Sequence, residues 1–126
     1  QSYLPMVTSH RAACPHMSNV KMTPELLSLI ADRFKVLAEP ARLQILQALR
    51  AGERSVSDLA HDTGLGQANL SKHLRSLYDG GFVDRRREGL FVIYRLADKD
   101  VFRICDLMCG RLDELSTKRR KLLAAR

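Results

Sequence analysis

The spacing of apolar residues changes at Gly80-Gly81, and this change limits the folds open to the chain. Before the two glycines, apolar residues recur at helical spacing, which is typical of helices that bury one face. After them, Phe82-Val83 and Phe91–Tyr94 are short β-favouring runs on either side of a charged tip that contains Glu88-Gly89. We therefore predict a mainly α fold with one β-hairpin, in the order of four helices, the hairpin and a last helix.

Local signals mark where these helices begin. Thr23 precedes a proline and an acid, a combination typical of an N-cap, and Pro40 suits the first turn of the second helix. Ser55 and Asp58 have the spacing of a capping arrangement for a short third helix. Asp98 is expected to cap the last helix.

The first and last predicted helices have more apolar surface than one small core can cover. The second helix has a single face to bury, with Leu43, Leu46 and Leu49. The first and last helices have broader apolar faces, made of Leu26, Leu27, Leu29, Ile30, Phe34 and Leu37 in the first, and of Val101, Ile104, Cys105, Met108, Leu112 and Leu115 in the last. We therefore expect a second copy of the chain to cover them in a homodimer.

Composition narrows the class of protein further. The 126 residues have room for one domain, and a formal net charge of +7 favours a polyanionic partner. No run is long and apolar enough for a membrane span, and none reads as a secretory signal. The 3 cysteines are an odd number, which argues against a secreted disulfide framework. We expect a cytoplasmic protein without membrane contact.

A glycine-containing turn, Gly64–Gly66, joins the third and fourth predicted helices as in a helix-turn-helix. The segment LGQANLSKHLRSL (65–77) follows, and its four leucines are expected to pack inward. The residues left to face outward are Gln67, Ala68, Asn69, Ser71, Lys72, His73 and Arg75. Gln and Asn suit paired hydrogen bonds to adenine, small residues allow close approach, and the cations suit phosphates or guanine. A solvated polar face is the alternative for an isolated helix.

The hairpin after this helix favours DNA binding over a merely solvated face. Its tip holds Arg85, Arg86 and Arg87, which are expected to lie along the DNA backbone or in a minor groove as a wing, and Arg86 and Arg87 are the expected DNA contacts. Helix-turn-helix and basic wing in this order predict a winged helix-turn-helix protein that binds double-stranded DNA.

The chain also resembles the ArsR/SmtB family of metal- and stress-responsive repressors. The resemblance lies in FKVLAEPARLQILQALRAGERSVSDLA (34–60), the helix described above and GFVDRRREGLFVIYRL (81–96). It implies a winged-helix homodimer, paired through its first and last helices, that represses transcription from an imperfect palindrome until an inducer lowers its DNA affinity. The family's base-reading positions match Gln67, Ser71 and Lys72, with Ala68 and His73 beside them. Leu90 departs from the basic residue often found after the wing-tip glycine.

Three parts of the chain are expected to differ in structure. Residues 1–22 lack periodicity and should form a flexible arm, and His16-Met17 is a dipeptide that a common cloning site encodes. Whether part of the arm is an expression remnant or the native chain starts at Met17 stays open. Residues 23–116 should form the winged-helix DNA-binding and dimerisation domain, followed by a basic tail, 117–126.

The metal sites that the resemblance implies are not matched by the residues present. The cysteine pair of the family's third helix falls on Ser55 and Ser57, which are poor ligands for soft metals. The zinc ligands of its last helix fall on Asp98, Asp100, Arg111 and Glu114, where a cation replaces a required imidazole. We expect neither site.

Cys105 and Cys109 are the remaining sensor candidates. They are four residues apart and should share one side of the last helix. With Cys14 from the arm they would form a three-thiolate site suited to As(III), Sb(III) or another soft metal ion. Oxidation or modification by reactive sulfur species is one alternative, and simple packing in the dimer contact is the other.

Other classes of function have less support. No phosphate-binding glycine loop, nucleophile elbow or metalloprotease motif is present, so we do not expect an enzyme. A nucleoid-type DNA-binding protein without a sensor would rely mainly on Lys and Arg, whereas Gln67 and Asn69 are base-reading types. A protein-interaction module of the same fold would not need the basic wing.

Overall fold

The computed structural model describes residues 21–125, so the predicted arm and Cys14 lie outside the described residues apart from positions 21 and 22. The predicted order of elements is confirmed, and one short strand is added before the third helix. The elements are α1 (Pro24–Leu37), α2 (Pro40–Leu49), β1 (Arg54–Ser55), α3 (Val56–Thr63), α4 (Gln67–Asp79), β2 (Val83–Glu88), β3 (Phe91–Leu96) and α5 (Val101–Ala124).

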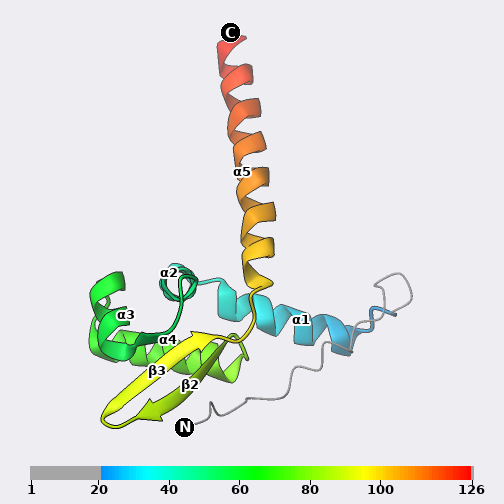
Figure 1. Ribbon diagram of the computed structural model, residues 1–126. Helices are drawn as coiled ribbons and strands as arrows, with labels where there is room; N and C mark the ends of the chain where they lie inside the picture. Colours follow the sequence, from blue (N-terminus) through cyan, green and yellow to red (C-terminus); the bar gives the residue numbers. More distant parts are fainter. Residues whose placement is uncertain (1–20, 126) are drawn as a thin grey trace.

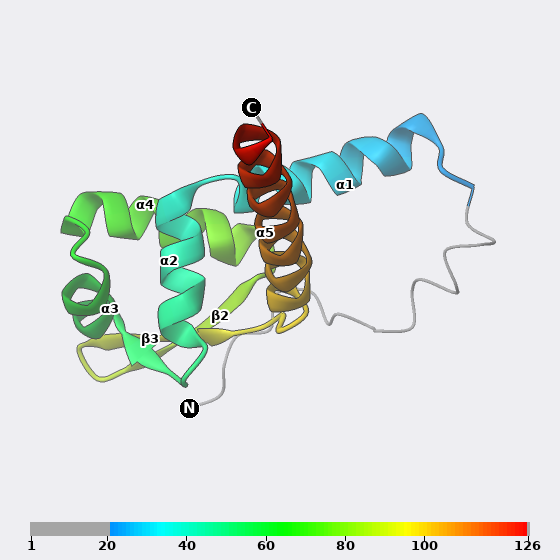
Figure 2. The same ribbon diagram turned by 90° about the horizontal axis from the view of Figure 1, so that it is seen from above.

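Helices α2, α3 and α4 lie together beside the strands and form one body with them (Figure 1). Helix α1 extends to one side of this body, and α5 stands out from it; a second view at right angles agrees (Figure 2). Two helices thus leave the body with much of their surface uncovered, and these are the two for which the sequence predicted excess apolar surface.

The strands form a three-stranded antiparallel sheet in the order β1-β3-β2. The β2-β3 hairpin, called the wing below, is in register from Val83 opposite Leu96 to Glu88 opposite Phe91. Gly89 at its tip has a positive φ of 61°, a conformation in which a Cβ would be strained. The short β1 pairs with the middle of β3 and attaches the base of the wing to the start of α3.

The core lies between α2, α3, α4 and the base of the wing. Its largest fully buried side chains come from these elements and from the start of α5, and they are Phe82, Ile45, Leu46, Leu49, Leu59, Leu70, Leu74, Leu77, Val83 and Val101. Within residues 21–125, no polar or charged side chain is buried. Full burial of one such leucine contributes about 1.5–3 kcal/mol, so the apolar contacts hold α4 against the body.

Three local expectations need correction or extension. Leu43 was expected in the core but is 38% exposed, and Ile45 is buried instead. Asp98 does not cap α5, because Asp100 occupies the N-cap position and donates its backbone N–H to Asp98 Oδ1 at 2.9 Å. Helix α5 also continues through the basic run 118–121 to Ala124.

Candidate nucleic-acid interface

The turn between α3 and α4 is built by local interactions. Ser55 and Asp58 form a complete capping box at the start of α3, as predicted. Gly64 ends α3 in the left-handed conformation, with φ of 71°, and donates its N–H to Ala60 O at 3.0 Å. Thr63 Oγ1 accepts from Leu65 N at 3.3 Å, which holds the chain as it enters α4. This is the tight turn that a helix-turn-helix needs.

Helix α4 has one apolar and one polar face. Leu70, Leu74 and Leu77 are buried, and Leu65 packs against the core from the turn. The polar candidates on the other side are exposed and are called the reading face below: Gln67, Ala68, Asn69, Ser71, Lys72 and Arg75. The structure thus brings six of the seven predicted helix residues onto one accessible surface.

His73, the seventh candidate, differs from the reading face because it is half-buried. Arg42 of α2 donates from Nε to His73 Nδ1 at 3.2 Å, and from Nη1 to Val36 O in α1 at 3.2 Å. No local signal in the sequence predicts this contact, because 31 residues separate Arg42 from His73.

The far end of α4 is held by Arg33 of α1. Its Nη1 donates to Gly80 O at 2.8 Å, its Nη2 lies 3.1 Å from Asp98 Oδ2, and its guanidinium stacks 4.2 Å from the centre of the Phe82 ring. Gly81 turns the chain with φ of 79°. These contacts join α1, the end of α4, the start of the wing and the approach to α5.

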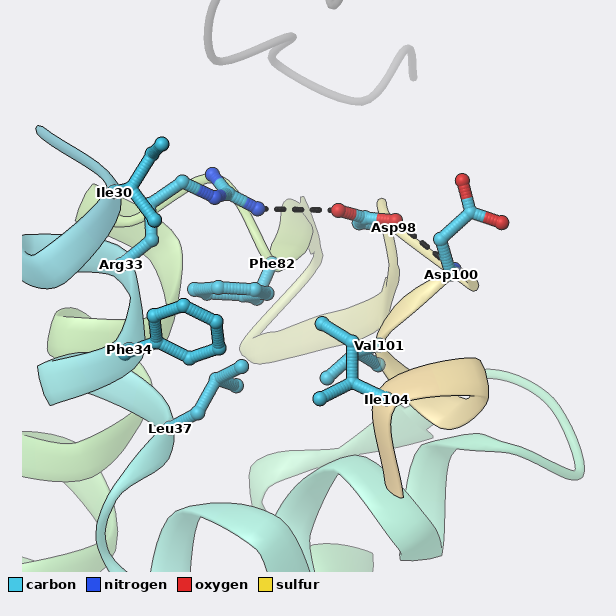
Figure 3. A pocket seen from close by; sticks show the side chains of 9 residues that line it. All are labelled: Ile30, Arg33, Phe34, Leu37, Phe82, Asp98, Asp100, Val101 and Ile104. Atoms are coloured by element: carbon cyan, nitrogen blue, oxygen red, sulfur yellow. Dashed lines mark hydrogen bonds and ion pairs between the residues drawn. The ribbon is translucent and has the colours of Figure 1, made fainter. Parts of the chain in front are cut away.

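Arg33 and Asp98 lie at the edge of a pocket of about 260 Å³ between α1 and the start of α5 (Figure 3). Its lining is mainly apolar, from Ile30, Phe34, Leu37, Phe82, Val101 and Ile104, with Asp100 beside Asp98. The side chains of Phe34 and Ile104 are also among the exposed large hydrophobic residues.

The three wing arginines have different surroundings. Arg85 lies 3.9 Å above the Tyr78 ring, and a hydrogen bond with Tyr94 raises the pKa of its guanidinium above the ordinary value, so it remains cationic. Arg86 has a side chain only 19% exposed and is paired with Glu53 and Glu88. Arg87 is exposed on the outer part of β2.

Glu53 is a residue that sequence reasoning missed. Its carboxylate lies 2.9 Å from Arg86 Nη2 across 33 residues of sequence, and it comes directly before β1. Because β1 pairs with β3, the ion pair crosses from one edge of the small sheet to the other. Predicting this ion pair from the sequence would have required knowing that β1 pairs with β3. A strand of two residues is too short to be recognised from an apolar pattern.

Cys105 and Cys109 both lie in α5, where Cys105 is half-buried and Cys109 is exposed; neither is in a disulfide. Within residues 21–125, no group of three or more His, Cys, Asp or Glu side chains is arranged to hold a metal ion.

None of the helices in the described part of the chain is both long enough and apolar enough to span a membrane.

Residues 39–85, from the start of α2 into the wing, match the arsR family of bacterial regulatory proteins. The HTH-type transcriptional regulator Rv0324 of Mycobacterium tuberculosis is 43% identical over 71% of this chain. The match covers only 39% of Rv0324, so this chain spans less than half the length of that relative.

Two solved structures share the fold over most of their length. The homodimeric winged helix-turn-helix DNA-binding domain of Mb0332 from Mycobacterium bovis, a possible ArsR-family regulator, is 40% identical with a TM-score of 0.63, covering 75% of this chain and 88% of that domain. The antimony-specific transcriptional repressor AntR is 30% identical with a TM-score of 0.66, and the match covers 84% of this chain and 97% of the AntR chain. The chain therefore belongs to the ArsR family of transcriptional regulators and has the winged helix-turn-helix DNA-binding fold.

Proposed function

We propose that the chain is a homodimeric, sequence-specific transcriptional repressor, which binds a palindromic operator in the cytoplasm and is released by an inducer. The observation that carries this proposal is the exposed polar surface of α4, presented by a buried leucine face in the same domain as a basic wing. A helix so presented can enter the major groove, while the wing lies along the backbone.

Within the reading face, side-chain chemistry assigns the roles. Gln67 and Asn69 are suited to bidentate hydrogen bonds with adenine N6 and N7. Ala68 and Ser71 are small and let the helix backbone approach the bases. Lys72 and Arg75 reach phosphates or guanine, although Arg75 also has a weak exposed pair with Asp79 at 3.8 Å.

The wing supplies affinity more than specificity. Arg87 is exposed and is the wing residue best placed to meet a phosphate. Arg86 also adds positive charge, and its pairs with Glu53 and Glu88 hold the guanidinium in place on β2. The same two carboxylates partly neutralise that charge. Counterions released from the DNA would make binding strongly dependent on salt.

The second copy covers the apolar surfaces of α1 and α5. Phe34 is 53% exposed, Leu107 is 77% exposed and Leu112 is 61% exposed, and large apolar patches of this kind mark association surfaces. The homodimeric state of the Mb0332 domain supports the same arrangement for this chain. A two-fold axis would set two α4 helices about one DNA turn apart, or a multiple of it.

Selection from a pool of randomised duplexes, followed by anisotropy titration, tests this proposal directly. The expected result is an enriched imperfect palindrome that binds on the order of a thousandfold or more tighter than a random duplex at equal salt. Enrichment of no sequence would contradict sequence-specific repression.

The proposed inducer is a thiophilic metalloid or metal, such as As(III) or Sb(III), bound by Cys105 and Cys109. Both thiols lie on one helix, in the surface that we assign to the dimer contact. A ligand bound there can therefore change the relative tilt of the two α4 helices in the dimer. AntR, which is antimony-specific by name, supports this class of inducer. Trivalent arsenic favours three thiolates, and Cys14 is the proposed third ligand.

A redox inducer is the second candidate. The exposure of Cys109 gives oxidants and reactive sulfur species direct access to its sulfur. A metalloid and an oxidant are distinguished by reversal with a phosphine reductant, which restores an oxidised thiol but supplies no thiolate to compete for a bound metalloid. A dithiol then releases the metalloid by ligand exchange.

A further inference from the structure

Arg42 connects three helices through a single side chain. It lies in α2, donates from Nη1 to Val36 O near the end of α1, and donates from Nε to His73 Nδ1 in α4, both at 3.2 Å. The contact region is partly buried, so water competes less for these hydrogen bonds than it would at the surface.

The contact fixes the state of the His73 ring. Nδ1 accepts a hydrogen bond from a guanidinium, which is always protonated, so Nδ1 itself has no proton. In the neutral imidazole the proton is then on Nε2. The only polar group that the ring has left to offer is therefore an N–H donor, and phosphate oxygens are the most abundant acceptors on DNA.

The contact also fixes the position of α4. The leucines on its buried face supply non-directional apolar attraction, which tolerates small sliding and rotation of the helix. The Arg42–His73 hydrogen bond is directional, and His73 is next to Lys72 and two residues from Ser71. Base readout needs side chains held to within about 0.5 Å, which a packed and hydrogen-bonded second layer provides.

We propose that Arg42 is a positioning residue for DNA recognition: it holds the reading face in register through His73 and keeps the His73 ring as an Nε2–H donor to a DNA phosphate. This inference rests on the proposed function and adds to it a role for Arg42 and a defined phosphate contact for His73, which the sequence had already placed beside the base-reading positions. Arg42 touches no base in this scheme, and its effect appears in the preference for operator over random DNA.

The test compares Arg42→Lys, His73→Leu and His73→Asn with the parent on a duplex enriched by selection and on a random duplex. Arg42→Lys keeps the charge but loses the fork that reaches both acceptors. It should lower the ratio of the two affinities about tenfold while leaving random binding within about twofold. His73→Leu should lower this ratio by the same factor. In the double variant the ratio should fall no further than in either single variant, because both changes remove the same contact.

His73→Asn provides the conservative rescue. Its Oδ1 can take the place of Nδ1 as acceptor, but it has no donor at the position of Nε2. The ratio should stay within about twofold of the parent, while both affinities fall several-fold. Arg50→Lys is the matched control, because Arg50 follows α2 at its other end and stacks on Phe102, and it should leave the ratio unchanged.

Two further measurements keep the test decisive. Urea unfolding shows that each variant is folded at the assay temperature, and ring ¹⁵N chemical shifts at pH 8 report the tautomer of His73 without DNA. The parent should show one tautomer with the proton on Nε2, and Arg42→Lys a mixture.

Additive losses in the double variant, an equal fall of operator and random binding in Arg42→Lys, or a tautomer mixture in the parent would overturn this inference. A selective parent with an equally selective Arg42→Lys variant would overturn it while leaving the proposed function intact. A parent without preference for any duplex would overturn both.

Discussion

The guanidinium of Arg86 on β2 lies 2.9 Å from the carboxylate of Glu53, a residue outside the wing. A second carboxylate, Glu88 near the tip, lies 2.8 Å from the same guanidinium. The wing is therefore tied to the segment before β1 as well as through its strand pairing. This gives Arg86 and Arg87, neighbours in sequence, different expected effects on stability.

For the wing, we predict that Arg87→Ala weakens binding to selected and random duplexes alike. It should also make the negative slope of log K against log salt shallower by about 1, since one phosphate contact is lost. Arg86→Ala should weaken DNA binding similarly and also lower the free energy of unfolding by about 1 kcal/mol, because Glu53 and Glu88 lose their partner. Anisotropy titrations over a salt series and urea unfolding measure the two effects. An unchanged salt slope in Arg87→Ala would rule out a phosphate contact from this residue.

For the reading face, Gln67→Ala should cost about 1–3 kcal/mol on the selected duplex and much less on random DNA. The physical reason is that a bidentate amide contact exists only with the correct base. The same titrations at one salt concentration measure this difference, and Gln47→Ala, in α2, is a matched control. If Gln67→Ala lowered both affinities equally, direct base readout by this side chain would be wrong.

For the dimer, Leu112→Glu should shift the protein toward monomer and reduce operator binding, because a charge replaces an apolar side chain in the contact between copies. Sedimentation at tens of micromolar measures the association state. Leu90→Glu is the control, since Leu90 is almost fully exposed between β2 and β3 and belongs to neither α1 nor α5, so this variant should remain dimeric. A parent that sediments as a monomer would remove the basis for palindrome recognition.

For the inducer, arsenite or antimonite should release the parent from its selected duplex, whereas the Cys105→Ser, Cys109→Ser double variant should stay bound. A coupling of about 1–3 kcal/mol is sufficient to change operator occupancy. Because ligation needs thiolates, binding should release protons and weaken as the pH falls. Removal of residues 1–16 tests Cys14 separately. A double variant that responds to metalloids and oxidants like its parent would assign both cysteines to packing.

Local sequence determined the boundaries of most elements. The capping box of Ser55 and Asp58 starts α3, Gly64 ends α3 with a positive φ, and Gly80 ends α4 just before Gly81, which has a positive φ. Such signals depend on only a few neighbouring residues. The buried face of α4 also followed from spacing alone, since its leucines recur with the helical period. The winged fold followed from the order of the elements and the basic hairpin, and the family resemblance agreed with it.

Tertiary structure decided which side of a short helix is buried and which charges meet. Helix α2 buries Ile45 and leaves Leu43 partly exposed because α3, α4 and the sheet pack on that side, which the helical period cannot specify. The pairs Arg42–His73 and Glu53–Arg86 join residues 31 and 33 positions apart. Such contacts depend on the relative placement of whole elements, and that placement is set by the shared apolar core, not by the sequence around either partner.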